Sequence, residues 1–179
     1  MSIIKKTNIY STALNILFIG LFSALFLDLG TNLYNLIMGL PLNDFAVIGR
    51  YALYTLQGHI ITSPINEIPV MQHEVVVGWM IHFMVSFVYA FFYVLFVEKG
   101  LFLKPSFKKG IVYAWVLLVF PLIVLSLALG DGIFHDHNPH MIKLILFSIF
   151  AHTCYGIGLY VTASILYHAR LELFKQISD

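Results

Sequence analysis

Three ionisable residues, Asp28, His82 and His152, each lie inside a long apolar stretch of this chain. A carboxylate and two imidazoles are ligands that zinc, iron, copper or manganese accept, and two facing imidazoles alone could ligate a haem. The same groups could relay protons, because a histidine titrates near neutrality and a nearby carboxylate tunes it. The third reading is a hydrogen-bonded lock that only fixes the register of neighbouring helices.

The three residues are expected at similar depths in a membrane. If the helices are straight, His82 lies ~10 Å and His152 ~12 Å below the outer edge of the hydrocarbon core. Asp28 lies ~18 Å below the same edge. Ionisable groups at such depths are costly and are functional by default. The shared depth therefore predicts a functional site at Asp28, His82 and His152, with a transition metal or haem as the expected cofactor or a proton as the relayed species.

Successive residues of a helix are turned by about 100° around its axis. On this spacing, polar residues fall on the same helix face as each of the three ionisable residues. Such polar faces turn toward protein rather than lipid, where they form interhelical hydrogen bonds. The residues predicted to complete an intramembrane polar site with Asp28, His82 and His152 are Asn32, Ser86, Tyr89 and Tyr155.

The composition defines the class of protein that must position these residues. Of the 179 residues, 60% are hydrophobic and 11% are charged, and the mean hydropathy is +0.88, which is far too apolar for a soluble domain. A span needs about 20 residues. We therefore predict an all-α integral membrane protein that forms a single domain over residues 1–179. Its four transmembrane helices are expected at about 11–38, 75–97, 111–129 and 142–167, with a kink at Pro121.

A short amphipathic helix is predicted after the first span, ending near Gln57, and its length favours an interfacial or re-entrant position. Arg50 on this helix could hold a lipid phosphate or another anion. The plainer reading is a snorkelling side chain or an ion pair. The candidate partners for that ion pair are Asp44, Glu67 and Asp131.

Two outer loops, 41–73 and 130–140, are expected to connect the spans. The second, GDGIFHDHNPH, is the most polar stretch of the chain and supplies His135, His137 and His140. An H-x-H pair could point both rings toward a copper or zinc ion. A solvated loop or a mouth for ions and protons explains the same histidines, since no spacing here matches a known zinc pattern.

Basic residues indicate the orientation. Eight of the ten fall on one side of the predicted spans, so the positive-inside rule places both termini in the cytoplasm. The eight are Lys5, Lys6, Lys99, Lys104, Lys108, Lys109, Arg170 and Lys175, while Arg50 and Lys143 lie on the other side. A net charge of +1 gives no argument for nucleic acid, and the single cysteine, Cys154, excludes an intramolecular disulfide.

Several short motifs resemble a bacterial family, the one catalogued as domain of unknown function 2938. They are Gly-Leu-Pro at 39–41, Gly49 with Arg50, Gly78 and Trp79 before His82, and His152 followed by Gly156, Gly158, Leu159 and Tyr160. The resemblance covers nearly the whole chain and implies a four-span inner-membrane protein. The positions to which the resemblance extends include Asp28, Arg50, His82 and His152. The histidine-rich loop departs from the Asn-Pro loop usual in the family.

Common enzyme motifs, such as GxSxG, HExxH, the P-loop and GxGxxG, do not occur, and whether the protein is an enzyme stays open. Metal or haem binding and proton relay are the leading hypotheses. The alternatives are a non-catalytic structural or assembly subunit that docks other membrane proteins, and a component of proton-coupled transport. The bilayer is the expected partner, and a second membrane protein or a second copy of the chain is left open.

Overall fold

A computed structural model describes residues 9–59, 64–99, 101 and 103–178, and within these ranges the regular elements are helices without strands. Lys5 and Lys6, which entered the orientation argument, lie outside the described residues. The all-α fold predicted from composition is therefore confirmed for the described part of the chain.

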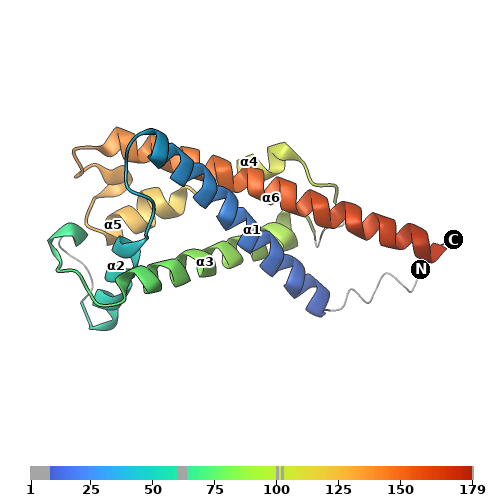
Figure 1. Cartoon of the computed structure of the whole chain (residues 1–179), viewed down its shortest axis with the longest axis horizontal. Helices are drawn as coiled ribbons and strands as arrows, with labels where there is room; N and C mark the ends of the chain where they lie inside the picture. Colours follow the sequence, from blue (N-terminus) through green and yellow to red (C-terminus); the bar gives the residue numbers. More distant parts are fainter. Residues whose placement is uncertain (1–8, 60–63, 100, 102, 179) are drawn as a thin grey trace.

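Four helical segments are long and apolar enough to cross a membrane, at 11–37, 74–97, 107–128 and 141–173. The α-helices that start these four segments are, in order, α1 (Ile9–Ile37), α3 (Glu74–Phe92), α4 (Phe107–Val116) and α6 (Met141–Ser178). The α3 helix continues as the π-helical turn η3 (Tyr93–Val97). Figure 1 shows α1 crossing α6, with the start of α1 and the end of α6 at the same end of the bundle.

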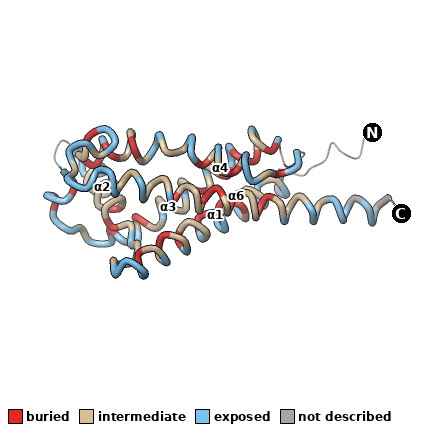
Figure 2. Tube along the Cα trace, turned by 90° about the horizontal axis from the view of Figure 1, so that it is seen from above, coloured by how far each residue is buried: buried red, intermediate tan, exposed pale blue. Residues whose placement is uncertain are grey.

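Two helix bounds differ from the sequence prediction. The α4 helix begins four residues earlier than predicted because the Ser106 hydroxyl caps it, accepting the N–H of Lys109. The α6 helix continues to Ser178, since no glycine or proline follows Gly158 and the polar residues after Tyr167 are good helix formers. Its last turns extend beyond the rest of the bundle and are exposed (Figure 2).

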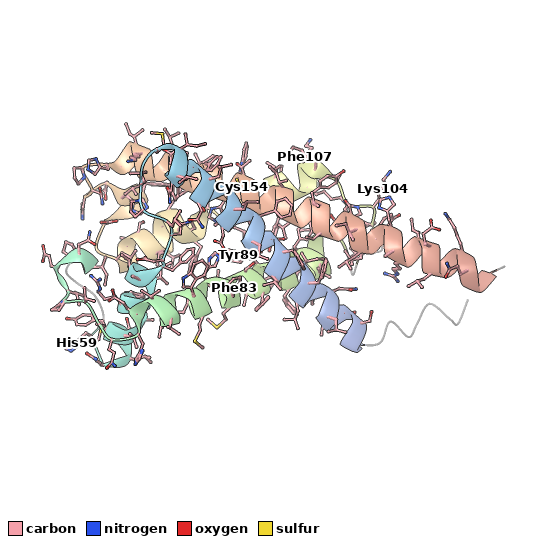
Figure 3. All side chains as sticks on the ribbon, viewed as in Figure 1. His59, Phe83, Tyr89, Lys104, Phe107 and Cys154 are labelled. Carbon is pink, nitrogen blue, oxygen red and sulfur yellow. The ribbon has the colours of Figure 1, made fainter. Side chains whose placement is uncertain are left out.

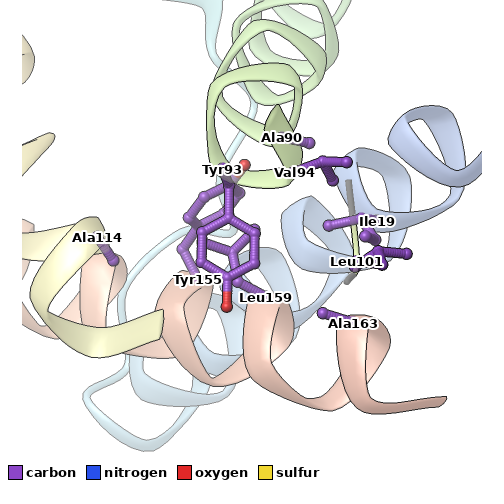
Figure 4. Close-up of a cluster of buried hydrophobic side chains, with 9 residues drawn as sticks. All are labelled: Ile19, Ala90, Tyr93, Val94, Leu101, Ala114, Tyr155, Leu159 and Ala163. Carbon is purple, nitrogen blue, oxygen red and sulfur yellow. The ribbon is translucent and has the colours of Figure 1, made fainter. Parts of the chain in front are cut away.

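Glycines allow the spans to pack closely. A Cβ at Gly158 of α6 would lie 2.8 Å from the Cα of Ser23 on α1, and one at Gly156 would lie 2.9 Å from the carbonyl oxygen of Gly110 on α4. Figure 4 shows the buried cluster that these contacts surround, in which Tyr93, Tyr155 and Leu159 meet. The core of the bundle is thus held by small residues at the contacts and large side chains between them.

The short helix α2 (Ala46–Leu56) and the 3-10 turn η2 (Ile65–Glu67) lie at the end of the bundle opposite the start of α1 (Figure 1). This element confirms the predicted short helix after the first span. A buried apolar cluster joins η2 to the end of the third span, where Ile65, Ile68 and Leu129 pack together.

The third span is irregular where Pro121 occurs. Regular α-helix ends at Val116, a π-helical segment η4 runs over Phe120–Leu125, and α-helix returns only in α5 (Ser126–Ala128). Pro121 has no N–H to donate to the preceding turn, so the helix cannot continue unchanged through it. The sequence predicted a kink at Pro121, and the structure shows the regular α-helix interrupted around this residue, which lines the cavity described below.

Candidate functional site

Two of the three predicted ionisable residues meet. The Nε2 atom of His82 lies 3.1 Å from Oδ1 and 3.2 Å from Oδ2 of Asp28, and the two side chains are 11% and 9% exposed. Only the contact with Oδ2 has the geometry of a hydrogen bond. The buried Oδ1 atom of Asp28 therefore forms no hydrogen bond, and the carboxyl group depends on His82 alone.

The Asp28–His82 contact brings together an acid and a base that could hold one proton between them. The proton can sit on the imidazole, which gives an ion pair, or on the carboxyl group, which gives two neutral groups. Both arrangements have the same net charge, so moving the proton between them does not change the charge that the membrane interior must accommodate. A pair of this kind can accept or release a proton while one partner compensates the other.

The ring of Phe45 covers His82. The two rings are stacked with centroids 4.1 Å apart and planes inclined by 18°, and Trp79 approaches His82 edge-on at 5.7 Å. Phe45 reaches this position with φ of 55° just before α2, a left-handed conformation that is uncommon for a residue with a side chain. The rings of Phe45 and Trp79 therefore pack directly against the imidazole of the acid–base pair.

A cavity of about 360 Å³ lies between α1, α2, α3, η4 and α6. His82 lines one side and His152 lines another, so the cavity joins the two predicted histidines. Tyr89 also lines it, and Figure 3 labels this residue on α3 in the middle of the bundle. Most of the wall is apolar, with contributions that include Leu27, Ile48, Val85, Phe120, Leu125 and Phe147.

His152 presents one ring nitrogen to its own helix. Its Nδ1 atom lies 3.0 Å from the carbonyl oxygen of Ser148. A carbonyl oxygen only accepts, so Nδ1 carries the proton in this contact. Nε2, on the other side of the ring, is then an acceptor in the neutral histidine.

The other predicted polar residues of the cavity differ in whether their hydrogen bonds are complete. The Ser86 hydroxyl donates to the carbonyl oxygen of Gly20 at 2.7 Å, and the Tyr155 hydroxyl donates to the carbonyl oxygen of Ser86 at 3.1 Å. The Tyr89 hydroxyl is buried and has no hydrogen-bond partner. Ser86 and Tyr155 thus connect helices, whereas Tyr89 has an unused polar group.

Asn32 belongs to a separate network. Its Oδ1 atom accepts the backbone N–H of Asn43 at 2.9 Å, and the Asn43 amide donates to the Thr31 hydroxyl at 2.6 Å and accepts from Asn35 at 3.0 Å. This network ties the chain after α1 back onto the end of that helix. Spacing along the chain does not show contacts across a turn, so this role of Asn43 could not be predicted from the sequence.

Arg50 forms a bidentate ion pair with Glu74. Its Nε and Nη2 atoms each lie 2.8 Å from a carboxylate oxygen of Glu74, and the side chains are 12% and 7% exposed. The hydrogen bond with Glu74 raises the pKa of Arg50 above its ordinary value, so the guanidinium is cationic at every physiological pH. The partner is Glu74 rather than the three acidic residues that the sequence suggested, and anion or lipid binding by Arg50 stays a prediction.

The outer-loop histidines point to different partners. The Nδ1 atom of His135 lies 3.0 Å from Asp131, whereas His137 is 72% exposed and 3.8 Å from Asp136. The backbone N–H of His140 donates to Asn138. Over the described ranges, no group of three or more His, Cys, Asp and Glu side chains is placed to hold a metal ion. The two metal hypotheses, at Asp28, His82 and His152 and in this loop, stay predictions.

Four apolar helices surrounding a buried acid–base pair indicate a multi-pass helical membrane protein. The chain belongs to the family described as protein of unknown function (DUF2938), which matches residues 17–166. This match confirms the family resemblance, and its range contains Asp28, Arg50, His82 and His152. No curated protein and no solved structure matches the chain.

Proposed function

We propose that Asp28 and His82 form a proton-exchanging site inside the membrane that serves the central cavity. One observation carries the proposal: His82 both contacts the carboxyl group of Asp28 at 3.1 Å and lines the cavity. The imidazole is therefore the link between the buried acid and whatever enters the cavity.

The incomplete hydrogen bonding of Asp28 supports this proposal over a purely structural lock. A lock is most stable when every buried oxygen of the carboxylate has a donor, because an unsatisfied buried acceptor costs about 1–3 kcal/mol. Asp28 has one hydrogen bond, through Oδ2, while Oδ1 lies 3.1 Å from Nε2 of His82 without a hydrogen bond of its own. A residue that gains and loses a proton must be able to exist without a full set of fixed donors.

The orientation follows from the charge distribution and is part of the same proposal. The connector between α3 and α4 contains Lys99, Lys104, Lys108 and Lys109, and the positive-inside rule assigns it to the cytoplasm of a bacterial inner membrane. The α2 helix then lies on the outer side, and the cavity that its residues Tyr51 and Ala52 help to line lies in the outer half of the protein.

Infrared difference spectroscopy of the protein in lipid bilayers tests the proposal without any ligand. Between alkaline and acidic samples we expect a protonated carboxyl band that shifts on exchange into D₂O and is absent from Asp28→Asn. His82→Gln should change the pH at which the band appears, because the imidazole no longer compensates the carboxylate.

The matched control is Asp44→Asn, which removes a carboxylate that accepts the N–H of Ala46 and does not line the cavity. It should keep the titrating band. A spectrum in which no band of Asp28 titrates or exchanges would overturn the proposal and leave Asp28 and His82 as a lock.

A further inference from the structure

We infer that the central cavity binds a small lipophilic molecule with one hydroxyl group, of the phenol class, and that Tyr89 and His152 bind this hydroxyl. The inference rests on the proposed function, because His82 lines the same cavity and the bound hydroxyl is the group with which a proton would be exchanged.

The size and walls of the cavity define the body of the ligand. Its volume of about 360 Å³ falls in the range of about 300–1,000 Å³ typical of small-molecule pockets. Aromatic and aliphatic side chains from all four spans form most of the wall, among them Leu27 of α1, Val85 of α3, Phe120 of η4 and Phe147 of α6. A molecule that fills this space must be mainly apolar.

Two polar groups of the wall define the head of the ligand. The Tyr89 hydroxyl is buried without a partner, so it has a proton to donate. Nε2 of His152 is an acceptor, since Nδ1 already donates to the Ser148 carbonyl. A hydroxyl group is both acceptor and donor and can satisfy the two residues together. A ketone would satisfy only Tyr89, and a charged head group would add an uncompensated charge in an apolar wall.

Several polar side chains of the wall are already used within the protein, although the hydroxyls of Tyr51 and Ser148 are not hydrogen-bonded within the described part of the chain. Ser86 and Tyr155 bond to carbonyl oxygens of α1 and α3, and His82 is engaged with Asp28. Among the described wall hydroxyls without a hydrogen bond, only that of Tyr89 is fully buried, so it depends most on a ligand for a partner. His152 lines the same cavity and can complete the contact, which indicates one hydroxyl group at this part of the ligand.

Equilibrium binding of β-naphthol to the protein in lipid nanodiscs, with empty nanodiscs subtracted, tests the inference. We expect saturable binding to the wild type. Tyr89→Phe and His152→Phe should each weaken it about three- to tenfold, as expected for loss of one hydrogen bond. Naphthalene has the same apolar body without the hydroxyl, and its binding should not change in Tyr89→Phe. Tyr54→Phe, at a tyrosine that does not line the cavity, is the control for β-naphthol.

A second pair of variants tests the location. Ala151 lines the cavity and is 8% exposed, so Ala151→Trp should fill the space and abolish binding. Val124→Trp introduces the same side chain at a position that is 51% exposed and outside the wall, and it should bind normally. The melting temperature of each variant shows whether it is folded.

Equal binding of β-naphthol to folded wild type and Ala151→Trp would overturn the inference. So would a loss in Ala151→Trp accompanied by no change in Tyr89→Phe and His152→Phe, because the hydroxyl would then have no role. Either failure is distinguishable from failure of the proposed function, since the Asp28 carboxyl band is measured without ligand.

Discussion

The buried polar residues divide by whether their hydrogen bonds are complete. Glu98 is fully buried, and its two carboxylate oxygens accept from the Tyr93 hydroxyl at 2.9 Å and from the Lys109 ammonium at 3.0 Å. This cluster joins the end of α3 to the start of α4 and needs nothing else. Asp28 and Tyr89 have unpaired atoms at or beside the cavity. Ser23 also has an unpaired hydroxyl, but this residue packs against Gly158 of α6 and does not line the cavity. An unpaired group therefore marks a residue with chemistry to offer only at or beside the cavity.

The Arg50–Glu74 pair belongs to the first group, and its removal should be costly. Glu74→Gln keeps the shape of the side chain but leaves the Arg50 guanidinium buried without its counter-charge, which typically costs about 3–5 kcal/mol. We expect a clearly lower melting temperature in detergent than for the wild type. Replacing both residues, as in Arg50→Met with Glu74→Leu, should recover part of that loss because no unpaired charge is left.

Glu67→Gln is the control for this measurement, since Glu67 is an exposed carboxylate on η2. Its melting temperature should equal that of the wild type. If Glu74→Gln were also unchanged, the ion pair would contribute nothing measurable, and α2 would be held on α3 by backbone contact alone.

At the scale of elements, periodicity and length were sufficient for much of the fold. Runs of apolar residues predicted the four spans, Pro121 predicted the interruption of the third, and amphipathic spacing predicted α2. The stacking of Phe45 on His82 could not be predicted. It depends on the left-handed backbone conformation of Phe45, and the sequence indicates such a conformation only where it has a glycine. The ion pair of Arg50 with Glu74 could not be predicted either. Glu74 directly precedes the span expected at 75–97, and nothing in the sequence indicates that it contacts the short helix.

The candidate site was predictable in part for a related reason. Depth along each helix placed Asp28 and His82 at similar levels, and the structure pairs them. Depth does not determine which way a ring turns, so it could not show that His152 bonds to Ser148 instead. Nor does it show empty space: the cavity depends on how η4 departs from the regular helix, which sequence spacing does not describe.

Backbone contact between α2 and α3 positions Phe45 over His82. A Cβ at Gly49 would meet the carbonyl oxygen of Glu74, and a Cβ at Gly78 would meet that of Phe45. Gly78→Val should therefore displace α2, at a cost of about 1–3 kcal/mol. Because Trp79 packs edge-on against Phe45 at 4.8 Å, its fluorescence, measured in a Trp115→Phe background, should shift to longer wavelength as the cover opens.

Val76→Leu is the matched control, because it enlarges a side chain of α3 that is 58% exposed. Neither the melting temperature nor the Trp79 emission should change in this variant. An unchanged emission in Gly78→Val would show that α2 tolerates the added side chain and that the close backbone approach does not hold Phe45 in place.

For the whole molecule, the two ends have different chemistry. The end where α1 begins and α6 ends adjoins the lysine-rich connector, whereas the opposite end carries α2 and the histidine-rich loop (Figure 1). The Asp28–His82 pair and the cavity lie toward the second end, since α2 covers both. If the Asp28–His82 pair exchanges protons as proposed, the orientation in the membrane decides from which side they come. With the lysines in the cytoplasm, the proposed exchange would be with the outer side.

Cysteine labelling of spheroplasts tests this orientation, starting from a Cys154→Ala background that removes the only native thiol. A membrane-impermeant maleimide should label His137→Cys, at a residue that is 72% exposed in the outer loop. It should label Gln176→Cys, near the end of α6, only after lysis. The reverse pattern would place the cavity in the cytoplasmic half, so that the Asp28–His82 pair would exchange protons with the cytoplasm. Labelling of both thiols in intact spheroplasts would contradict a membrane crossing by α6, because the two positions lie on either side of that span.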